Sequence, residues 1–279
     1  MKTKLLVLTI IPFLLTSCGE NHDTKPEPIH YEVISVQPFY EDLKEVCKDD
    51  KILGFPEGVT SEADIIIEGG KNLAKSLNNV SYKDENNLKN TAINKNTFTK
   101  FGKNQVILLQ THGNYIDEWS HETFVTGEKY DETSIPKDEE DMILIANEFV
   151  PGTTDRSSQI TPDYVKKYCP DVTGSVVYMG QCHGGHDPIL AQTFLDKGAV
   201  AVYGSTLQIH MHYGDMMQYR VTSLLGEVNP ETNNYYTTGE ALKKAQSEYG
   251  IDDSVKYQGS AMGARMILFG DPNFRLANK

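Results

Sequence analysis

The sequence is poor in several residue classes, and each shortage narrows the range of functions. Among its 279 residues are 4 cysteines and 1 tryptophan, and 26 lysines and arginines stand against 39 aspartates and glutamates. The formal net charge of −13 and the lack of a lysine- or arginine-rich patch argue against binding to nucleic-acid phosphates. Such a surface would favour cationic partners instead. Internal repeats and low-complexity segments are also lacking.

Long hydrophobic runs are scarce as well, and the main one lies at the start of the chain. Residues 5–15 are apolar almost throughout, follow Lys2 and Lys4, and are succeeded by small residues before Cys18. The run is shorter than the ~20 residues that a membrane-spanning helix needs. This pattern is typical of a secretory signal peptide, so we expect residues 1–17 to be a leader.

The end of this leader carries a second signal. The sequence Leu15-Thr16-Ser17-Cys18 resembles the bacterial lipobox, in which the cysteine receives a diacylglyceryl group and becomes the first residue. Residues 18–29 are polar and charged, and they are predicted to be a tether between lipid and fold. The resemblance implies a membrane partner through the lipid on Cys18 and a location in the cell envelope. Glu20 favours the outer membrane or cell surface over the inner membrane.

Thiols are few for an exported protein. Apart from Cys18 the chain has Cys47, Cys169 and Cys182. An odd number of cysteines in an oxidising compartment points to a reactive thiol. A disulfide between Cys47 and Cys169 stays open, because the sequence alone does not show whether the two meet.

Residues 30–279 alternate between strand-like and helix-like patterns and predict one domain. The short apolar runs 105–110, 175–179 and 199–203 are each stopped by turn residues, as expected for strands buried on both faces of a parallel sheet. The helical segment 188–197 links the last two runs and predicts a parallel crossover. Further strands are expected at 30–36, 80–82, 142–150 and 264–269, and further helices at 62–78, 94–101, 161–168, 213–225 and 239–249. The pattern predicts an α/β fold with helices on both faces of the sheet.

Reactive side chains follow two of these predicted strands. His112 and Gly113 come after residues 105–110, and Cys182 comes after residues 175–179. Because the carboxyl ends of neighbouring parallel strands share one edge of a sheet, we expect His112 and Cys182 to lie side by side. An imidazole in that place accepts the thiol proton and makes the sulfur nucleophilic. The N–H groups of Gly113 and Cys182 would then face an oxyanion.

These motifs resemble the clan CD cysteine peptidases, which include caspases, gingipains, clostripain, separase and the CHAT domains. In that clan an apolar strand ends in His-Gly, and a later strand ends in a small residue or Gln followed by Cys. The likeness runs from about residue 60 to residue 276 and includes segments 194–205, 240–245 and 268–276, the last with a closing Gly-Asp-Pro. His112 and Cys182 are further apart than the ~50 residues quoted for caspases, and an insertion at about 118–159 accounts for the difference. Gly180-Gln181 is a second departure, since many relatives have Gln-Ala, Glu-Ala or Ser-Ala there.

The resemblance implies a caspase-like α/β/α three-layer sandwich and a cysteine endopeptidase. Cys182 would attack the scissile carbonyl and form a thioester, and His112 would protonate the leaving amine and then activate water. The implied partners are peptide or protein substrates. No metal or other cofactor is implied at the catalytic pair, although some relatives respond to calcium and this acidic chain would favour that ion.

The residues that recognise the substrate are less clearly marked. The resemblance places an extended substrate strand beside residues 204–209, which makes Gly204, Ser205 and Thr206 candidates for substrate binding. The chain is acid-rich and arginine-poor near the motifs, with Asp187 and Asp215 following them, and Asp215 is the fourth candidate. A carboxylate in the pocket favours cleavage after Arg or Lys. Arg156, in a polar stretch of the insertion, is a candidate site of self-cleavage.

Two other functions are left open. An inactive peptidase fold anchored by lipid would bind ligands in the cleft without cleaving them. A zinc-binding protein is the other alternative, with ligands drawn from Cys182, His183, His186, His210 and His212. The Cys-His-x-x-His spacing is unusual for zinc, so the peptidase is the preferred interpretation.

Overall fold

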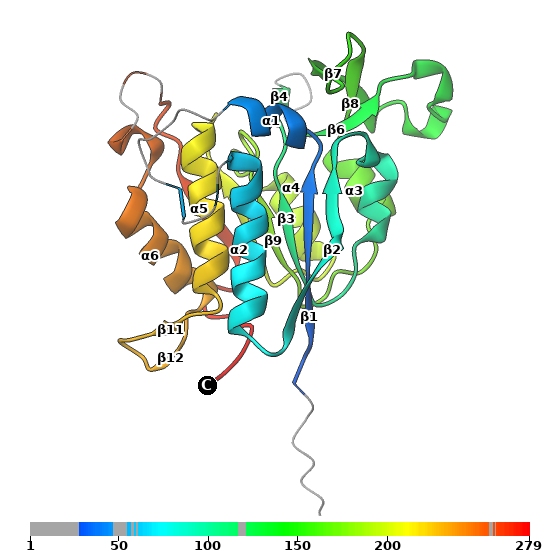
Figure 1. The fold of residues 1–279 in the computed structure, drawn as a ribbon. Coiled ribbons are helices and arrows are strands. Elements are labelled where there is room, and N and C mark those ends of the chain that lie inside the picture. The colour runs from blue at the N-terminus through cyan, green and yellow to red at the C-terminus, as the bar shows by residue number, and fades with distance from the viewer. Residues whose placement is uncertain are drawn as a thin grey trace, which may run out of the picture.

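A six-stranded sheet forms the centre of the molecule in the computed structural model, which describes residues 28–46, 55–56, 59, 61–116, 121–256, 259 and 261–279 (Figure 1). The strands lie in the order β13–β10–β9–β3–β1–β2. They are parallel except for β13, which runs antiparallel to β10. Their bounds are β1 Tyr31–Gln37, β2 Val80–Lys89, β3 Gln105–Leu109, β9 Val176–Met179, β10 Ala201–Ser205 and β13 Met266–Gly270. The predicted mostly parallel sheet is confirmed.

Helices cover both faces of this sheet (Figure 1). On one face α2, α5 and α6 bury the side chains of alternate strand residues such as Val33, Leu108 and Tyr203. On the other face α3 and α4 cover Ile107 and Val177. The helix bounds are α1 Tyr40–Val46, α2 Glu62–Ser76, α3 Pro162–Tyr168, α4 Ile189–Asp196, α5 Met211–Leu224 and α6 Thr238–Tyr249. The result is a three-layer α/β arrangement with a hydrophobic core on each side of the sheet.

Local sequence explains where these elements begin. The hydroxyl of Ser61 accepts a hydrogen bond from the Asp64 N–H (3.3 Å), which caps α2 at the predicted place. All of β3 is buried, as the apolar run from Val106 to Leu109 predicts. The weak helical pattern at 94–101 becomes a 3₁₀ helix, Lys95–Lys100. β2 extends well past residue 82, because its second half is a polar edge strand without the apolar pattern used to predict strands.

The insertion forms a small antiparallel sheet of its own, in the order β6–β8–β7. Its strands are β6 Phe124–Lys129, β7 Ile143–Phe149 and β8 Arg156–Ile160, of which only β7 was expected. The expectation that Arg156 lies in an exposed loop is wrong. Arg156 begins the central strand, its carbonyl accepts a hydrogen bond from the Tyr130 N–H (2.8 Å), and Ser157 is buried. Self-cleavage after Arg156 would require this strand to detach first, so the structure gives it no support.

The remaining described elements are short. Two strand pairs are β4 Tyr115–Ile116 with β5 His121–Glu122, and β11 Val228–Asn229 with β12 Asn234–Tyr235. Further 3₁₀ turns occur at Asn90–Ala92, Glu132–Ser134, Lys137–Glu139 and Asp253–Val255. The pair β4–β5 matters most for the site, because it follows His112 directly.

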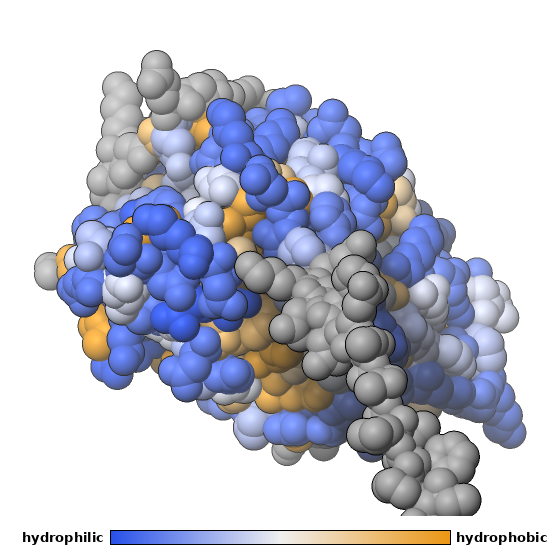
Figure 2. Space-filling view, turned by 90° about the horizontal axis from the view of Figure 1, so that it is seen from below, coloured by the Kyte–Doolittle hydropathy of each residue, from blue (hydrophilic) through white to orange (hydrophobic). Residues whose placement is uncertain are grey.

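The end of the sheet where the parallel strands begin carries a groove of about 560 Å³ beside Tyr31, Leu77 and Phe274. Figure 2, seen from this end, shows a largely hydrophilic surface with an apolar strip. Within the described ranges, no helix has the length and apolar character needed to cross a membrane. The predicted leader, Cys18, most of the tether, Cys47 and part of the insertion lie outside the described residues.

Candidate active site

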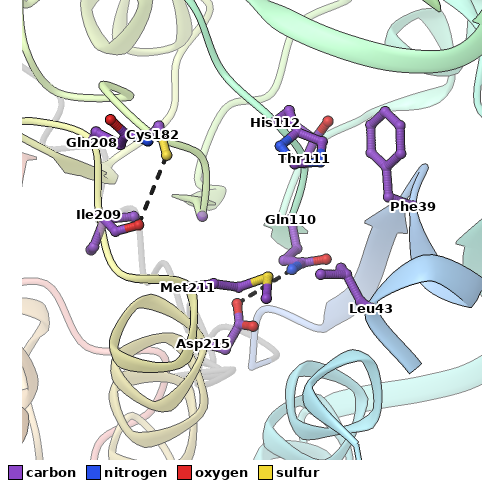
Figure 3. Close-up of a pocket in the computed structure, with 11 residues that line it drawn as sticks. Phe39, Leu43, Gln110, Thr111, His112, Cys182, Gln208, Ile209, Met211 and Asp215 are labelled. Carbon is purple, nitrogen blue, oxygen red and sulfur yellow. Dashed lines mark hydrogen bonds between the residues drawn. The ribbon is translucent and has the colours of Figure 1, made fainter. Parts of the chain in front are cut away.

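A cavity of about 190 Å³ opens where the neighbouring strands β3 and β9 end. His112 comes from the segment after β3 and Cys182 from the segment after β9, and the two line opposite sides of the cavity (Figure 3). Asp215 and Gln110 lie at its base in the same view. The structure therefore brings the predicted catalytic pair together with one predicted substrate-binding residue.

His112 is held between the sheet and two added segments. Its carbonyl accepts a hydrogen bond from the Val125 N–H on β6 (3.2 Å), and the Phe39 ring packs edge-on against the imidazole with 4.6 Å between ring centroids. Burial lowers the pKa of His112, while the carboxylates of Glu148 and Asp42 act in the opposite direction and offset only part of it. The imidazole is therefore neutral at rest, as a general base must be.

Cys182 lies at a tight turn after β9. The next residue, His183, has φ 62°, a left-handed conformation that residues other than glycine seldom adopt. The His183 N–H donates to the carbonyl of Leu207 (3.0 Å), and the Cys182 sulfur lies 3.9 Å from the carbonyl oxygen of Ile209. Burial raises the pKa of the Cys182 thiol above its ordinary value. The resting pair is accordingly a neutral thiol facing a neutral imidazole.

Glycine is required at two positions around this pair. A Cβ on Gly113 would lie 2.4 Å from the carbonyl oxygen of Cys182 and 2.6 Å from Cγ of Gln181, so no larger residue fits between the segments that carry His112 and Cys182. A Cβ on Gly180 would lie 2.6 Å from Oε1 of Gln218 and 2.8 Å from the Leu109 carbonyl oxygen. The Gly-Gln-Cys sequence thus follows from the close approach of α5 and β3 to the end of β9.

The base of the cavity is acidic. Asp215, on α5, is 2% exposed, and the Gln110 amide donates to one of its oxygens (3.4 Å). Its other oxygen has no hydrogen-bond partner among the groups that the structure describes. Burial holds the pKa of Asp215 well above its usual range, and the nearby carboxylate of Glu62 raises it further. Glu62 is itself buried and pairs with the His212 ring (2.6 Å).

The walls of the cavity are apolar. Phe39 precedes α1 and Leu43 lies on it, while Ile209 precedes α5 and Met211 is the first residue of that helix (Figure 3). The sequence analysis missed Phe39, Leu43 and Met211, whereas Ile209 lies at the end of the predicted segment 204–209. A usable signal was the aromatic pair Phe39-Tyr40 immediately after the first strand, at the sheet edge where the site was already expected.

Several predicted site residues lie elsewhere. Gly204 and Ser205 belong to β10, whose backbone is already paired with β13, and the Thr206 N–H donates to the Arg265 carbonyl (2.9 Å). These three residues do not line the cavity, whereas Gln208 and Ile209 of the same predicted segment do. Asp187 faces Glu122 instead of the cavity.

The residues of the zinc alternative do not form one ligand set. His212 pairs with Glu62, the His186 ring contacts the Thr206 carbonyl (2.9 Å), and the Cys182 sulfur lies near Ile209. In the described part of the chain, no three His, Cys, Asp or Glu side chains gather as metal ligands would. Cys169 is a buried free thiol whose pKa is raised to about 12 by burial. Its suggested partner, Cys47, lies outside the described residues.

Comparisons with known proteins assign no family to the chain. The chain matches no protein-family model, and no curated protein matches it in sequence. The resemblance to clan CD peptidases therefore stays a prediction from the sequence motifs.

Proposed function

We propose that the protein is a cysteine endopeptidase with a caspase-like fold and a Cys182–His112 catalytic pair. The observation that carries the proposal is that both side chains reach one cavity from adjacent parallel strand ends. The three-layer architecture supports the same conclusion, because ligands in such sheets bind where the strands end.

The electrostatics of the pair define how the reaction would begin. Burial disfavours both charged forms, so the thiol proton must pass to His112 as the sulfur attacks the scissile carbonyl. The imidazolium formed in this step then gives its proton to the leaving amine, and a thioester with Cys182 remains. The carboxylates that raise the pKa of His112 stabilise this imidazolium. Hydrolysis of the thioester, with His112 as base towards water, restores the thiol.

The shape of the cavity supports cleavage after Arg or Lys. An apolar wall of Phe39, Leu43 and Met211 would contact the aliphatic stem of such a side chain. The free oxygen of Asp215 would accept hydrogen bonds from the cationic end. A buried carboxyl without a second donor is costly to ionise alone, and a bound cation removes that cost.

A peptide-library digest tests the proposal. Wild type should cut predominantly after Arg or Lys, and Cys182→Ala should cut nothing while keeping its circular-dichroism spectrum. Equal cleavage by both proteins would contradict the role of Cys182. A folded wild type that cleaves no peptide would instead support an inactive fold that binds ligands.

We also propose that the domain is held in the cell envelope by lipid on Cys18. The lipobox-like sequence before that cysteine supports the idea. Mass spectrometry of the membrane-extracted protein should find a diacylglyceryl group on Cys18 and no residue before it. An intact Met1, or an unlipidated start at another residue, would contradict it.

A further inference from the structure

A buried carboxyl that takes no part in the proposed chemistry bridges the two catalytic segments. Glu122, the last residue of β5, is 1% exposed. Its Oε1 accepts a hydrogen bond from the Asp187 N–H (2.8 Å), in the loop that follows Cys182. Its Oε2 has no hydrogen-bond partner within the described residues. The side chain thus ties the insertion to the nucleophile loop.

The residues that follow Glu122 fix the other catalytic segment. The Thr123 N–H donates to the Asn114 carbonyl (3.1 Å), and the Val125 N–H donates to the carbonyl of His112 (3.2 Å). The Thr123 carbonyl in turn accepts from the Gln181 amide, next to Cys182 (3.4 Å). Residues 122–125 therefore form a strap that contacts the main chain of His112 directly. On the other side the strap contacts the neighbours of Cys182, through the Gln181 amide and the Asp187 N–H.

We propose, on the basis of the proposed peptidase function, that Glu122 is a positioning residue. Its neutral, protonated side chain would hold the loop that follows Cys182 against the segment that carries His112. A neutral carboxyl still accepts the Asp187 N–H through its carbonyl oxygen. A carboxylate in the same place would hold a charge that backbone N–H groups stabilise only in part, in a site where burial disfavours ionisation. It would also face the Asp187 side chain, one of whose oxygens is likewise buried without a partner among the described groups.

The surroundings of Glu122 agree with the protonated form. Burial raises the pKa of Glu122 to about 8, and the carboxylate of Asp187 adds to the rise. Hydrogen bonds from the backbone at Asp187 and His186 act in the opposite direction. Above this pKa the ionised side chain would move towards water and release the Asp187 N–H, so the loop would loosen.

Two substitutions distinguish the hydrogen bond that Glu122 accepts from the effect of its ionisation. Glu122→Gln keeps an acceptor oxygen and cannot ionise, whereas Glu122→Ala removes the acceptor. Glu128→Gln is the matched control, because Glu128 on β6 also accepts a backbone N–H, that of Lys95 (3.1 Å). Among the described residues, Glu128 makes no hydrogen bond to the loop that follows Cys182. Each protein is assayed for kcat and KM on an Arg-ending peptide across pH, and for the iodoacetamide alkylation rate of Cys182 by peptide mapping.

We expect Glu122→Ala to lower kcat about ten- to a hundred-fold with KM changed less than about three-fold, because the nucleophile is displaced while the substrate cavity is kept. Glu122→Gln should have the activity of wild type below about pH 7. Above about pH 8 it should keep more of its activity than wild type does. Glu128→Gln should follow wild type throughout. An unchanged kcat in Glu122→Ala, or superimposable alkaline limbs for Glu122→Gln and wild type, would overturn the proposal.

The alkylation rate separates this inference from the proposed function. If wild type cleaves no peptide, the peptidase proposal fails. The alkylation rate of Cys182 would still show whether the loop that follows it keeps its position. Divergence of wild type from Glu122→Gln only above about pH 8 then supports the positioning role. Identical rates at all pH values overturn it.

Discussion

Two buried carboxyls flank the catalytic pair, and the comparison between them shows how neighbours decide what a carboxyl does. Asp215 and Glu122 are almost fully buried, each has one oxygen without a described partner, and burial raises the pKa of both. Asp215 lines the base of the cavity, where we propose that it meets the cationic end of a substrate side chain. Glu122 lies between two loops and is bound to a backbone N–H, so it holds structure. In the proposed roles, a buried carboxyl serves recognition at Asp215 and positioning at Glu122.

The largest effect should come from the pair that the two carboxyls flank. Cys182→Ala and His112→Ala should each lower kcat by about a thousand-fold or more, and the double variant little further, because the two act as one unit. Rates are measured on an Arg-ending fluorogenic peptide. Cys169→Ala is the control, since this buried thiol lies away from the cavity. Near-wild-type activity in either single variant would show that the assignment is wrong.

The close approach between the two catalytic segments gives the next largest effect. Gly113→Ala should lower kcat by about a hundred-fold, because its Cβ would meet the Cys182 carbonyl oxygen 2.4 Å away and push the segments apart. Gly102→Ala is the matched control, since the nearest atom to its Cβ would be 3.7 Å away. Equal activities of the two variants would show that this approach is unimportant for catalysis.

Asp215 should affect recognition and leave the chemical step alone. Asp215→Asn should lower kcat/KM for Arg- and Lys-ending peptides by about a hundred-fold, as expected when a buried charge pair loses one partner. A peptide ending in citrulline, the neutral analogue of arginine, should be cleaved at a similar rate by both proteins. An equal loss of kcat/KM on both peptides would show that Asp215 supports the fold and does not determine specificity.

The raised pKa of Asp215 adds a pH dependence with a definite sign. At low pH the carboxyl is protonated and binds a cation weakly, so KM for the Arg-ending peptide should fall as pH rises. KM for the citrulline peptide should not show this dependence. A KM for the Arg-ending peptide that is flat with pH, or rises, would contradict the proposed binding of a cation by Asp215.

Glu122 should have the smallest effect on recognition but a measurable effect on stability. Its folded pKa of about 8 lies above the ordinary value of 4.5, so the unfolded chain releases the proton first and wild type loses stability as pH rises through this window. Glu122→Gln has no such loss and should become more stable than wild type by roughly 1–3 kcal/mol near pH 8. Urea unfolding across pH measures the difference. A constant difference between the two proteins at all pH values would contradict the raised pKa.

The sequence predicted the parts of the molecule that depend on local pattern. The buried strands, the crossover helix α4 and the convergence of His112 and Cys182 follow from apolar runs that end in turn residues. Polar strands were missed, because β8 is Arg-Ser-Ser-Gln-Ile and forms through hydrogen bonds with its neighbours. That Gly204, Ser205 and Thr206 lie outside the cavity was also beyond the local pattern, since the pairing of this segment with β13 depends on a strand some sixty residues away. The role of Glu122 also depends on contacts distant in sequence, and its own neighbours give no hint of it.

An active-site label offers the most direct test of the central claim. Wild type is incubated with a peptidyl acyloxymethyl ketone that ends in arginine, and the intact mass and modified residue are determined. The account predicts one adduct, on Cys182, that forms far more slowly in His112→Ala and in Asp215→Asn. A label on Cys169, or labelling of Cys182 at the wild-type rate in His112→Ala, would contradict it.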